Sequence, residues 1–117
     1  GGVRSVLLVD DDHLVREMMS DVLLRQGYQV RQAQNSEQAL ALLDDQVELL
    51  LTDFAMPEFN GAQLAHAARQ RFPGLPVVIL TGYAELQGLE LPGSLVIQKP
   101  VSEQVLAQAL ADLLEKR

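Results

Sequence analysis

Short apolar runs alternate along the chain with stretches in which apolar residues recur every three or four positions. Four of the runs are almost wholly apolar, and those at 5–9 and 49–52 are typical of parallel strands buried on both faces of a sheet. The four runs cover residues 5–9, 49–52, 77–80 and 95–97. A fifth run, residues 28–33, alternates between apolar and polar positions, as an edge strand does. The pattern therefore predicts five strands separated by helices.

The stretches between these runs carry helix signals at their ends. A side chain that accepts a hydrogen bond precedes most of the predicted helices, and a glycine follows the first of them. The second predicted helix starts with a capping box, in which Asn35 and Gln38 satisfy each other's backbone N–H groups. The first contains two adjacent methionines, Met18 and Met19, which are expected to fill the core. The residues that mark the other ends are Asp12, Gly27, Gly61 and Ser102.

The alternation of strands and helices predicts the fold class. Right-handed crossovers between successive parallel strands place helices on both faces of the sheet. The expected fold is therefore α/β and doubly wound, with five strands and up to five helices. In such folds ligands bind at the carboxyl ends of the strands.

Polar residues follow four of the predicted strands at that edge. They are Asp10 with Asp11, Asp53, Thr81 and Lys99. Three carboxylates at one edge repel each other unless a cation lies among them, and carboxylate oxygens are ligands that Mg²⁺ prefers. An ammonium and a hydroxyl beside a divalent cation suit a phosphoryl group. The sequence thus predicts a site where a metal-screened aspartate attacks phosphorus.

Composition limits the partners and the size of the protein. The 117 residues suffice for one domain. Because 48% of them are apolar and 21% are charged, a core can form without stabilisation by disulfides or structural metal ions. The net charge of −7 disfavours direct binding to nucleic acid or to an anionic membrane. The sequence has no cysteine, which excludes disulfides and thiol chemistry and fits a reducing cytoplasm.

Four short motifs stand at these strand ends. They are Val-Leu-Leu-Val-Asp-Asp-Asp at 6–12, Asp-Phe-Ala-Met-Pro-Glu-Phe-Asn-Gly at 53–61, Leu-Thr-Gly-Tyr-Ala at 80–84 and Lys-Pro at 99–100. Together and in this order they resemble the receiver domain of bacterial two-component response regulators. The resemblance spans nearly the whole chain and implies a flavodoxin-like fold with strand order 2-1-3-4-5. It also implies that residues 1–117 form a single phosphoacceptor domain.

The resemblance implies a magnesium site at the predicted acidic cluster. Asp11 and Asp53 would bind Mg²⁺ directly, and Asp10 would bind through water. The backbone carbonyl of Ala55 would complete the protein ligands.

The resemblance also assigns the phosphoryl chemistry. Asp53 would accept a phosphoryl group from a phosphohistidine on a sensor histidine kinase or a phosphotransfer protein. Lys99 would contact the phosphoryl oxygens, and Thr81 would move to bond them. The family further implies a cis peptide bond between Lys99 and Pro100.

The sequence departs from the family at positions that transmit the signal after phosphorylation. Many receivers carry an aromatic switch residue where this chain has Val96. Tyr83 is the candidate to take part of that role or to cover part of the acyl phosphate. The stretch between Thr81 and Lys99 is shorter than is common in the family and contains Gly88, Pro92 and Gly93. We therefore expect a shortened or missing fourth helix. This resembles the receivers of hybrid sensor kinases.

Three alternatives to a phosphoacceptor remain. A phosphatase of the haloacid dehalogenase type would use Asp10 as nucleophile with Asp12, but the acids it needs after Lys99 lie only in the last predicted helix. A degenerate receiver would bind partners without chemistry, although the expected site residues are all present. A flavin binder would need a phosphate loop after the first strand, which the sequence lacks. His13 and His66 have no partners at metal-ligand spacing and are expected on the surface.

Overall fold

The computed structural model describes residues 4–82 and 94–115. The strands are β1 (Ser5–Val9), β2 (Gln29–Ala33), β3 (Leu49–Asp53), β4 (Val77–Thr81) and β5 (Ser94–Gln98). The helices are α1 (His13–Arg25), α2 (Ser36–Leu42), α3 (Gly61–Arg71) and α4 (Glu103–Glu115). All five strands pair in parallel, in the order β2-β1-β3-β4-β5. The predicted doubly wound fold and its strand order are confirmed.

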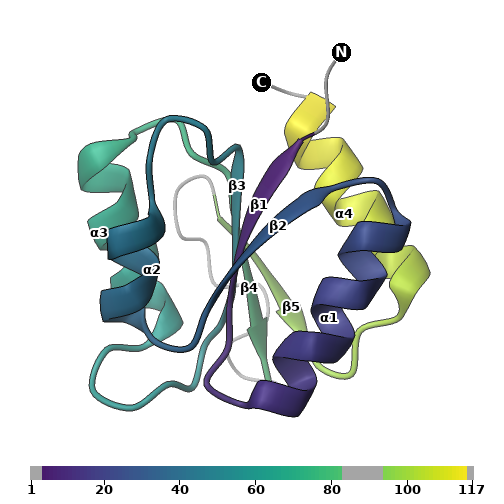
Figure 1. Ribbon diagram of the computed structural model, residues 1–117, viewed down its shortest axis with the longest axis horizontal. Helices are drawn as coiled ribbons and strands as arrows, with labels where there is room; N and C mark the ends of the chain where they lie inside the picture. The colour runs from purple at the N-terminus through teal and green to yellow at the C-terminus, as the bar shows by residue number, and fades with distance from the viewer. Residues whose placement is uncertain (1–3, 83–93, 116–117) are drawn as a thin grey trace.

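The helices form one layer on each side of the sheet. Figure 1 shows α1 and α4 on one face and α2 and α3 on the other. Alternate side chains of β1 enter different cores, because successive residues of a strand point to opposite faces. Leu7 and Val9 lie in the core beneath α2 and α3, and Val6 and Leu8 lie in the core beneath α1 and α4. Every residue of β1 is buried, as its apolar run predicts.

Helix α1 buries a narrower stripe than its apolar residues suggest. Leu23 is fully buried, and Met19 packs against the same core. Met18 is 66% exposed and Leu14 is 73% exposed, so the prediction that Met18 fills the core is wrong. These two residues are four positions apart and therefore share a face of the helix, which α1 turns away from the sheet. The predicted helix end is confirmed at Gly27, whose φ of 95° suits glycine.

The start of α2 only partly follows the predicted capping box. The Asn35 side chain accepts a hydrogen bond from the backbone N–H of Gln38 at 2.7 Å, as expected. The Gln38 side chain, however, accepts from the backbone N–H of Gln34 at 2.7 Å instead of that of Asn35. A complete capping box occurs at α3, between Asn60 and Gln63, where the sequence analysis did not predict one.

Two predictions fall on residues outside the described ranges. The shortened fourth helix and the position of Tyr83 both belong to residues 83–93. Val96, which replaces the aromatic switch, lies on β5 and is buried in the core beneath α2 and α3. Within residues 4–82 and 94–115, each helix is too short or too polar to cross a membrane.

Candidate functional site at the carboxyl edge of the sheet

The predicted polar residues meet at the carboxyl edge of the sheet. Asp10 follows β1, Asp53 ends β3 and Lys99 follows β5. The ammonium Nζ of Lys99 lies 2.7 Å from Oδ1 of Asp53 and 3.9 Å from Oδ2 of Asp10. The strands β1 and β3 are neighbours in the sheet and β5 lies two strands from β3, so residues far apart in the sequence reach the same edge.

Three carboxylates at this edge form a group that suits a divalent cation. One oxygen each from Asp10, Asp11 and Asp53 can be chosen so that all three lie within 4.8 Å of one another. Lys99 supplies one positive charge against three negative ones. Oxygen-only ligands with an excess of negative charge match hard cations such as Mg²⁺. The side chains therefore fit the ion that the sequence predicts.

In the absence of a cation, the environment of Asp10 disfavours the ionised form of its carboxyl. Asp10 is only 4% exposed, and burial is the first cause that raises the pKa of its carboxyl above the usual 3.8. The negative charges of Asp53 and Asp11 raise this pKa further. The backbone N–H of Asp12, which donates to Oδ1 of Asp10 at 2.9 Å, and the charge of Lys99 act in the opposite direction. The raised pKa means that the folded protein holds a proton on Asp10 more tightly than a solvated carboxyl would.

Thr81 and Lys99 stand on neighbouring strand ends. The backbone N–H of Lys99 donates to the carbonyl of Thr81 at 2.7 Å, which joins the segment after β5 to the end of β4. Thr81 is buried, with 1% of its surface exposed. The peptide bond between Lys99 and Pro100 is cis, as the resemblance implied.

The loop after β3 carries the predicted backbone ligand. Ala55 is exposed in this loop, two residues beyond Asp53. The loop is tied at its start, where the backbone N–H of Phe54 donates to the carbonyl of Leu80 at 2.8 Å. It is tied at its end by the N–H of Gly61, which donates to the carbonyl of Phe54 at 2.8 Å. These bonds hold the loop beside the acidic cluster.

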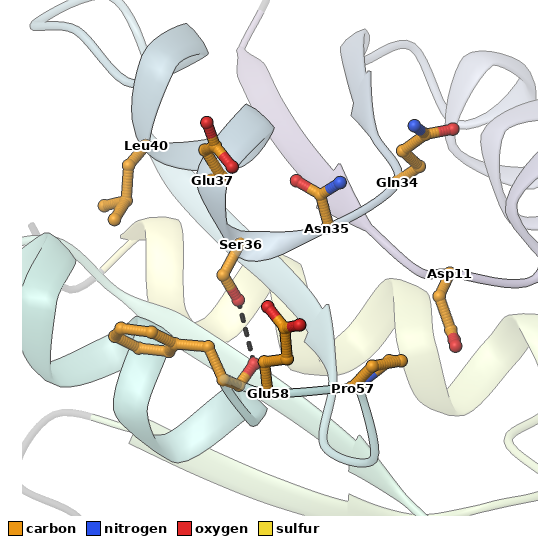
Figure 2. Close-up of a pocket in the computed structure, with 9 residues that line it drawn as sticks. Asp11, Gln34, Asn35, Ser36, Glu37, Leu40, Pro57 and Glu58 are labelled. Atoms are coloured by element: carbon orange, nitrogen blue, oxygen red, sulfur yellow. Dashed lines mark hydrogen bonds between the residues drawn. The ribbon is translucent and has the colours of Figure 1, made fainter.

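A hollow of about 680 Å³ adjoins the acidic cluster at Asp11. Figure 2 shows its walls, which are the turn from β2 into α2 and the loop after β3. The hydroxyl of Ser36 donates to the carbonyl of Phe59 at 2.9 Å and joins the two walls. Glu37 and Glu58 also line the hollow, so its charge has the same sign as that of Asp11.

Sequence analysis did not single out Arg16, which contacts the site through the backbone. Its Nη1 donates to the carbonyl of Asp10 at 2.7 Å. An arginine on a predicted helix is usually solvated, so the sequence held no signal for this contact. His13 and His66 are exposed and stand outside the carboxylate group, as predicted.

Asp12 has a structural task. Its Oδ1 accepts hydrogen bonds from the backbone N–H groups of Leu14 at 3.0 Å and Val15 at 3.2 Å, which caps α1 as predicted. The phosphatase alternative would need this carboxylate beside Asp10 as a second catalytic acid. The group of carboxylates that can share a cation instead joins Asp10 to Asp11 and Asp53.

Comparison with known proteins gives a consistent result across the chain. A sequence model described as the response regulator receiver domain matches residues 6–111. The transcriptional regulatory protein CpxR of Klebsiella pneumoniae is 37% identical over 118 residues, which cover 97% of this chain and 50% of that protein. The chain thus spans about half the length of the curated relatives that match it first.

Solved structures share the fold over nearly the whole chain. A CheY-like response regulator receiver domain protein from Methanospirillum hungatei is 28% identical, with a TM-score of 0.89 and coverage of 98% of this chain and 96% of that one. The signal receiver domain of a signal transduction histidine kinase from Syntrophus aciditrophicus is 27% identical, with a TM-score of 0.85 and coverage of 97% and 92%. Similar folds therefore occur both in response regulators and in a histidine kinase.

Proposed function

Because the chain belongs to the family of receiver domains of two-component response regulators, we propose that Asp53 is its phosphoacceptor. The observation that carries this proposal is the position of the Asp53 carboxylate. It ends the central strand β3, with the Lys99 ammonium 2.7 Å away and two further carboxylates beside it. Its side chain is 11% exposed, so it is largely enclosed by the fold without being fully buried.

The proposed reaction is a phosphoryl transfer from a phosphohistidine of a partner. A carboxylate oxygen of Asp53 attacks the phosphorus, an O–P bond forms, and the N–P bond of the phosphohistidine breaks. The electron pair of that bond returns to the imidazole nitrogen of the partner. Lys99 moves its ammonium from Asp53 to the phosphoryl oxygens, and the hydroxyl of Thr81 donates to another of them. The same residues assist later hydrolysis of the acyl phosphate by water.

The ligands proposed for Mg²⁺ are the carboxylates of Asp11 and Asp53 and the carbonyl of Ala55, with Asp10 acting through water. When bound, the cation neutralises the charge that accumulates on the phosphoryl oxygens. The cluster of three carboxylates around a single ammonium supports this assignment. Asp10 then serves mainly to keep the local charge negative enough to retain the ion.

The domain acts as a signalling module and not as a dedicated enzyme. Residues 1–117 form one receiver domain that promotes its own phosphorylation and dephosphorylation. Its phosphodonor is a sensor histidine kinase or a phosphotransfer protein in the cytoplasm. The net charge of −7 supports a role without direct contact to nucleic acid or to a membrane.

Intact mass spectrometry after incubation with acetyl phosphate and Mg²⁺ tests the proposal. The unsubstituted protein should gain the mass of one phosphoryl group, and Asp53→Ala should gain none. Asp10→Ala should still be modified, at a lower rate, because Asp10 is placed outside the direct metal ligands. An adduct that survives Asp53→Ala and disappears with Asp10→Ala would instead favour the phosphatase alternative.

A further inference from the structure

Arg16 connects the acidic cluster to the body of the protein. It lies in the second turn of α1, and its guanidinium contacts three groups on different segments. Nη1 donates to the carbonyl of Asp10 at 2.7 Å, and Nε donates to Oε1 of Gln32 on β2 at 3.2 Å. Nη2 lies 3.0 Å from Nδ1 of His13. The guanidinium thus joins the end of β1 to both α1 and the neighbouring strand.

The contact to Gln32 is itself supported from the interior. Nε2 of Gln32 donates to the hydroxyl of Ser20 at 3.2 Å, and Ser20 is only 4% exposed. Gln32 is therefore held by two residues of α1, Arg16 and Ser20, with both polar ends of its amide satisfied. A planar guanidinium held at two edges by fixed partners has little freedom to turn.

The peptide that Arg16 holds sets the direction of the metal ligands. The carbonyl of Asp10 belongs to the peptide bond that leads into Asp11, so its orientation determines how Asp11 leaves the strand. The Asp10 carboxylate is oriented separately, by the backbone N–H of Asp12 at 2.9 Å. Among the described residues, the ion pairs do not include Arg16, so its contact with this cluster is made through the backbone.

The geometry points to Arg16 as a positioning residue for the magnesium site. It fixes the peptide between Asp10 and Asp11, and so holds their carboxylates ready for the ion. This inference rests on the metal site of the proposed function. Groups outside the direct ligands that orient them commonly change metal affinity by 10- to 100-fold when removed.

Because Arg16 is positively charged, the direction in which Mg²⁺ affinity changes on its replacement tests the inference. A positive charge near a cation site weakens cation binding, so removal of the charge alone should strengthen Mg²⁺ binding. Loss of the positioning contact should weaken it. Arg16→Met removes both the charge and the donors, and the two effects then oppose each other.

The experiment is a Mg²⁺ titration of the protein without phosphodonor, followed by the NMR shifts of backbone amides at constant ionic strength. Arg16→Met should raise the Kd for Mg²⁺ about tenfold or more. Arg16→Lys keeps the charge and one donor for the Asp10 carbonyl, and its Kd should lie between those of Arg16→Met and the unsubstituted protein. Arg25→Met is the matched control, since Arg25 lies in the last turn of the same helix and pairs with Glu103. Its Kd should not change.

An equal or lower Kd for Arg16→Met would overturn the inference, because loss of charge would then explain the result. If Arg16→Met does not fold, Arg16→Gln takes its place in the titration, since it removes the charge and keeps only one short donor. A higher Kd for Mg²⁺ then supports the inference, and an equal or lower Kd overturns it. Absence of Mg²⁺ binding to the unsubstituted protein would instead overturn the metal site itself, together with this inference.

Discussion

Asp10 illustrates how a single residue can favour function over stability. Its carboxyl is buried beside two others, and burial first and then those charges raise its pKa above 3.8. A folded state with a raised carboxyl pKa binds a proton more tightly than the unfolded chain does. The free energy of unfolding therefore falls as the pH rises from the ordinary pKa through the raised one. At neutral pH, without a divalent cation, the ionised Asp10 destabilises the fold.

Asp10→Asn should therefore stabilise the metal-free protein at neutral pH. The amide oxygen can still accept the backbone N–H of Asp12, while the buried charge is gone. We expect the free energy of unfolding at about pH 7 to rise by on the order of 1 kcal/mol. The gain should shrink toward zero as the pH falls below the ordinary carboxyl pKa, because Asp10 is then protonated in both the folded and the unfolded protein. Urea unfolding in the presence of EDTA across this pH range measures both quantities.

Asp44→Asn provides a control of opposite sign. The pKa of Asp44 is lowered, first by the backbone N–H of Gln46 and then by Arg31, so its ionised form stabilises the fold. Asp44→Asn should reduce stability at neutral pH, with the difference disappearing as the pH falls below the ordinary pKa. If Asp10→Asn also lowered stability at neutral pH, the account of Asp10 would be wrong.

The residue types in the sequence predicted which groups form the site, but they did not predict the contacts that hold those groups in place. Asp10, Asp53 and Lys99 could be placed together because each follows an apolar run, and the carboxyl ends of parallel strands share one edge. Arg16 could not be found in this way. Its contact to the Asp10 carbonyl depends on where α1 turns back over the sheet, and a polar residue on a helix carries no sign of a backbone partner six positions earlier.

At the scale of elements, the site depends on how closely α3 approaches the end of β3. Gly61 begins α3, and a Cβ built there would lie 2.6 Å from the carbonyl oxygen of Asp53 and 3.0 Å from Cα of Phe54. Both are backbone atoms, so a side chain at this position requires the helix or the strand end to move. The glycine therefore sets the distance between the helix and Asp53, the proposed phosphoacceptor.

Gly61→Ala should lower both stability and phosphorylation. We expect a loss of about 1–3 kcal/mol in the free energy of unfolding, the usual range for overpacking. Phosphorylation of Asp53 by acetyl phosphate should be slower, because the strand end that carries it is displaced. Urea unfolding and the rate of adduct formation by intact mass test the two effects.

Gly74→Ala is the matched control for this substitution. A Cβ at Gly74 would meet no atom within 4 Å, so the change adds a methyl group without a clash. It should leave the phosphorylation rate unchanged and stability equal or slightly higher, since alanine restricts the unfolded chain. Equal behaviour of the two variants would mean that close packing at Gly61 has no special importance.

The elements themselves were largely predictable, and the exceptions have local causes. Four apolar runs and one alternating run identified the five strands, because each run is bounded by charged or turn residues. The exposure of Met18 was not predictable, since apolar residues occupy more of the circumference of α1 than the sheet can cover. The partner of Gln38 was missed for another reason, since its long side chain can reach either of two adjacent N–H groups at the start of α2.

For the molecule as a whole, the proposed magnesium ligands make ion binding depend on global folding. Asp11 and Asp53 follow β1 and β3, which are neighbours in the sheet but far apart along the chain. The complete ligand set therefore exists only in the folded protein, and an ion that binds only this state stabilises it. The net charge of −7 adds a second effect, since any salt relieves general repulsion by screening.

The two effects can be separated by comparing Mg²⁺ with sodium at equal ionic strength. At a concentration of Mg²⁺ near 100 times the Kd, specific binding should add about 2.7 kcal/mol to the free energy of unfolding. Sodium chloride should produce only the smaller screening increment. Asp11→Asn removes one direct ligand, and in this variant Mg²⁺ should stabilise little more than sodium does. Thermal unfolding of both proteins in the two salts measures the difference. Equal stabilisation of the unsubstituted protein by the two salts would contradict specific binding, because screening alone would then account for the effect of the divalent ion on the acidic fold.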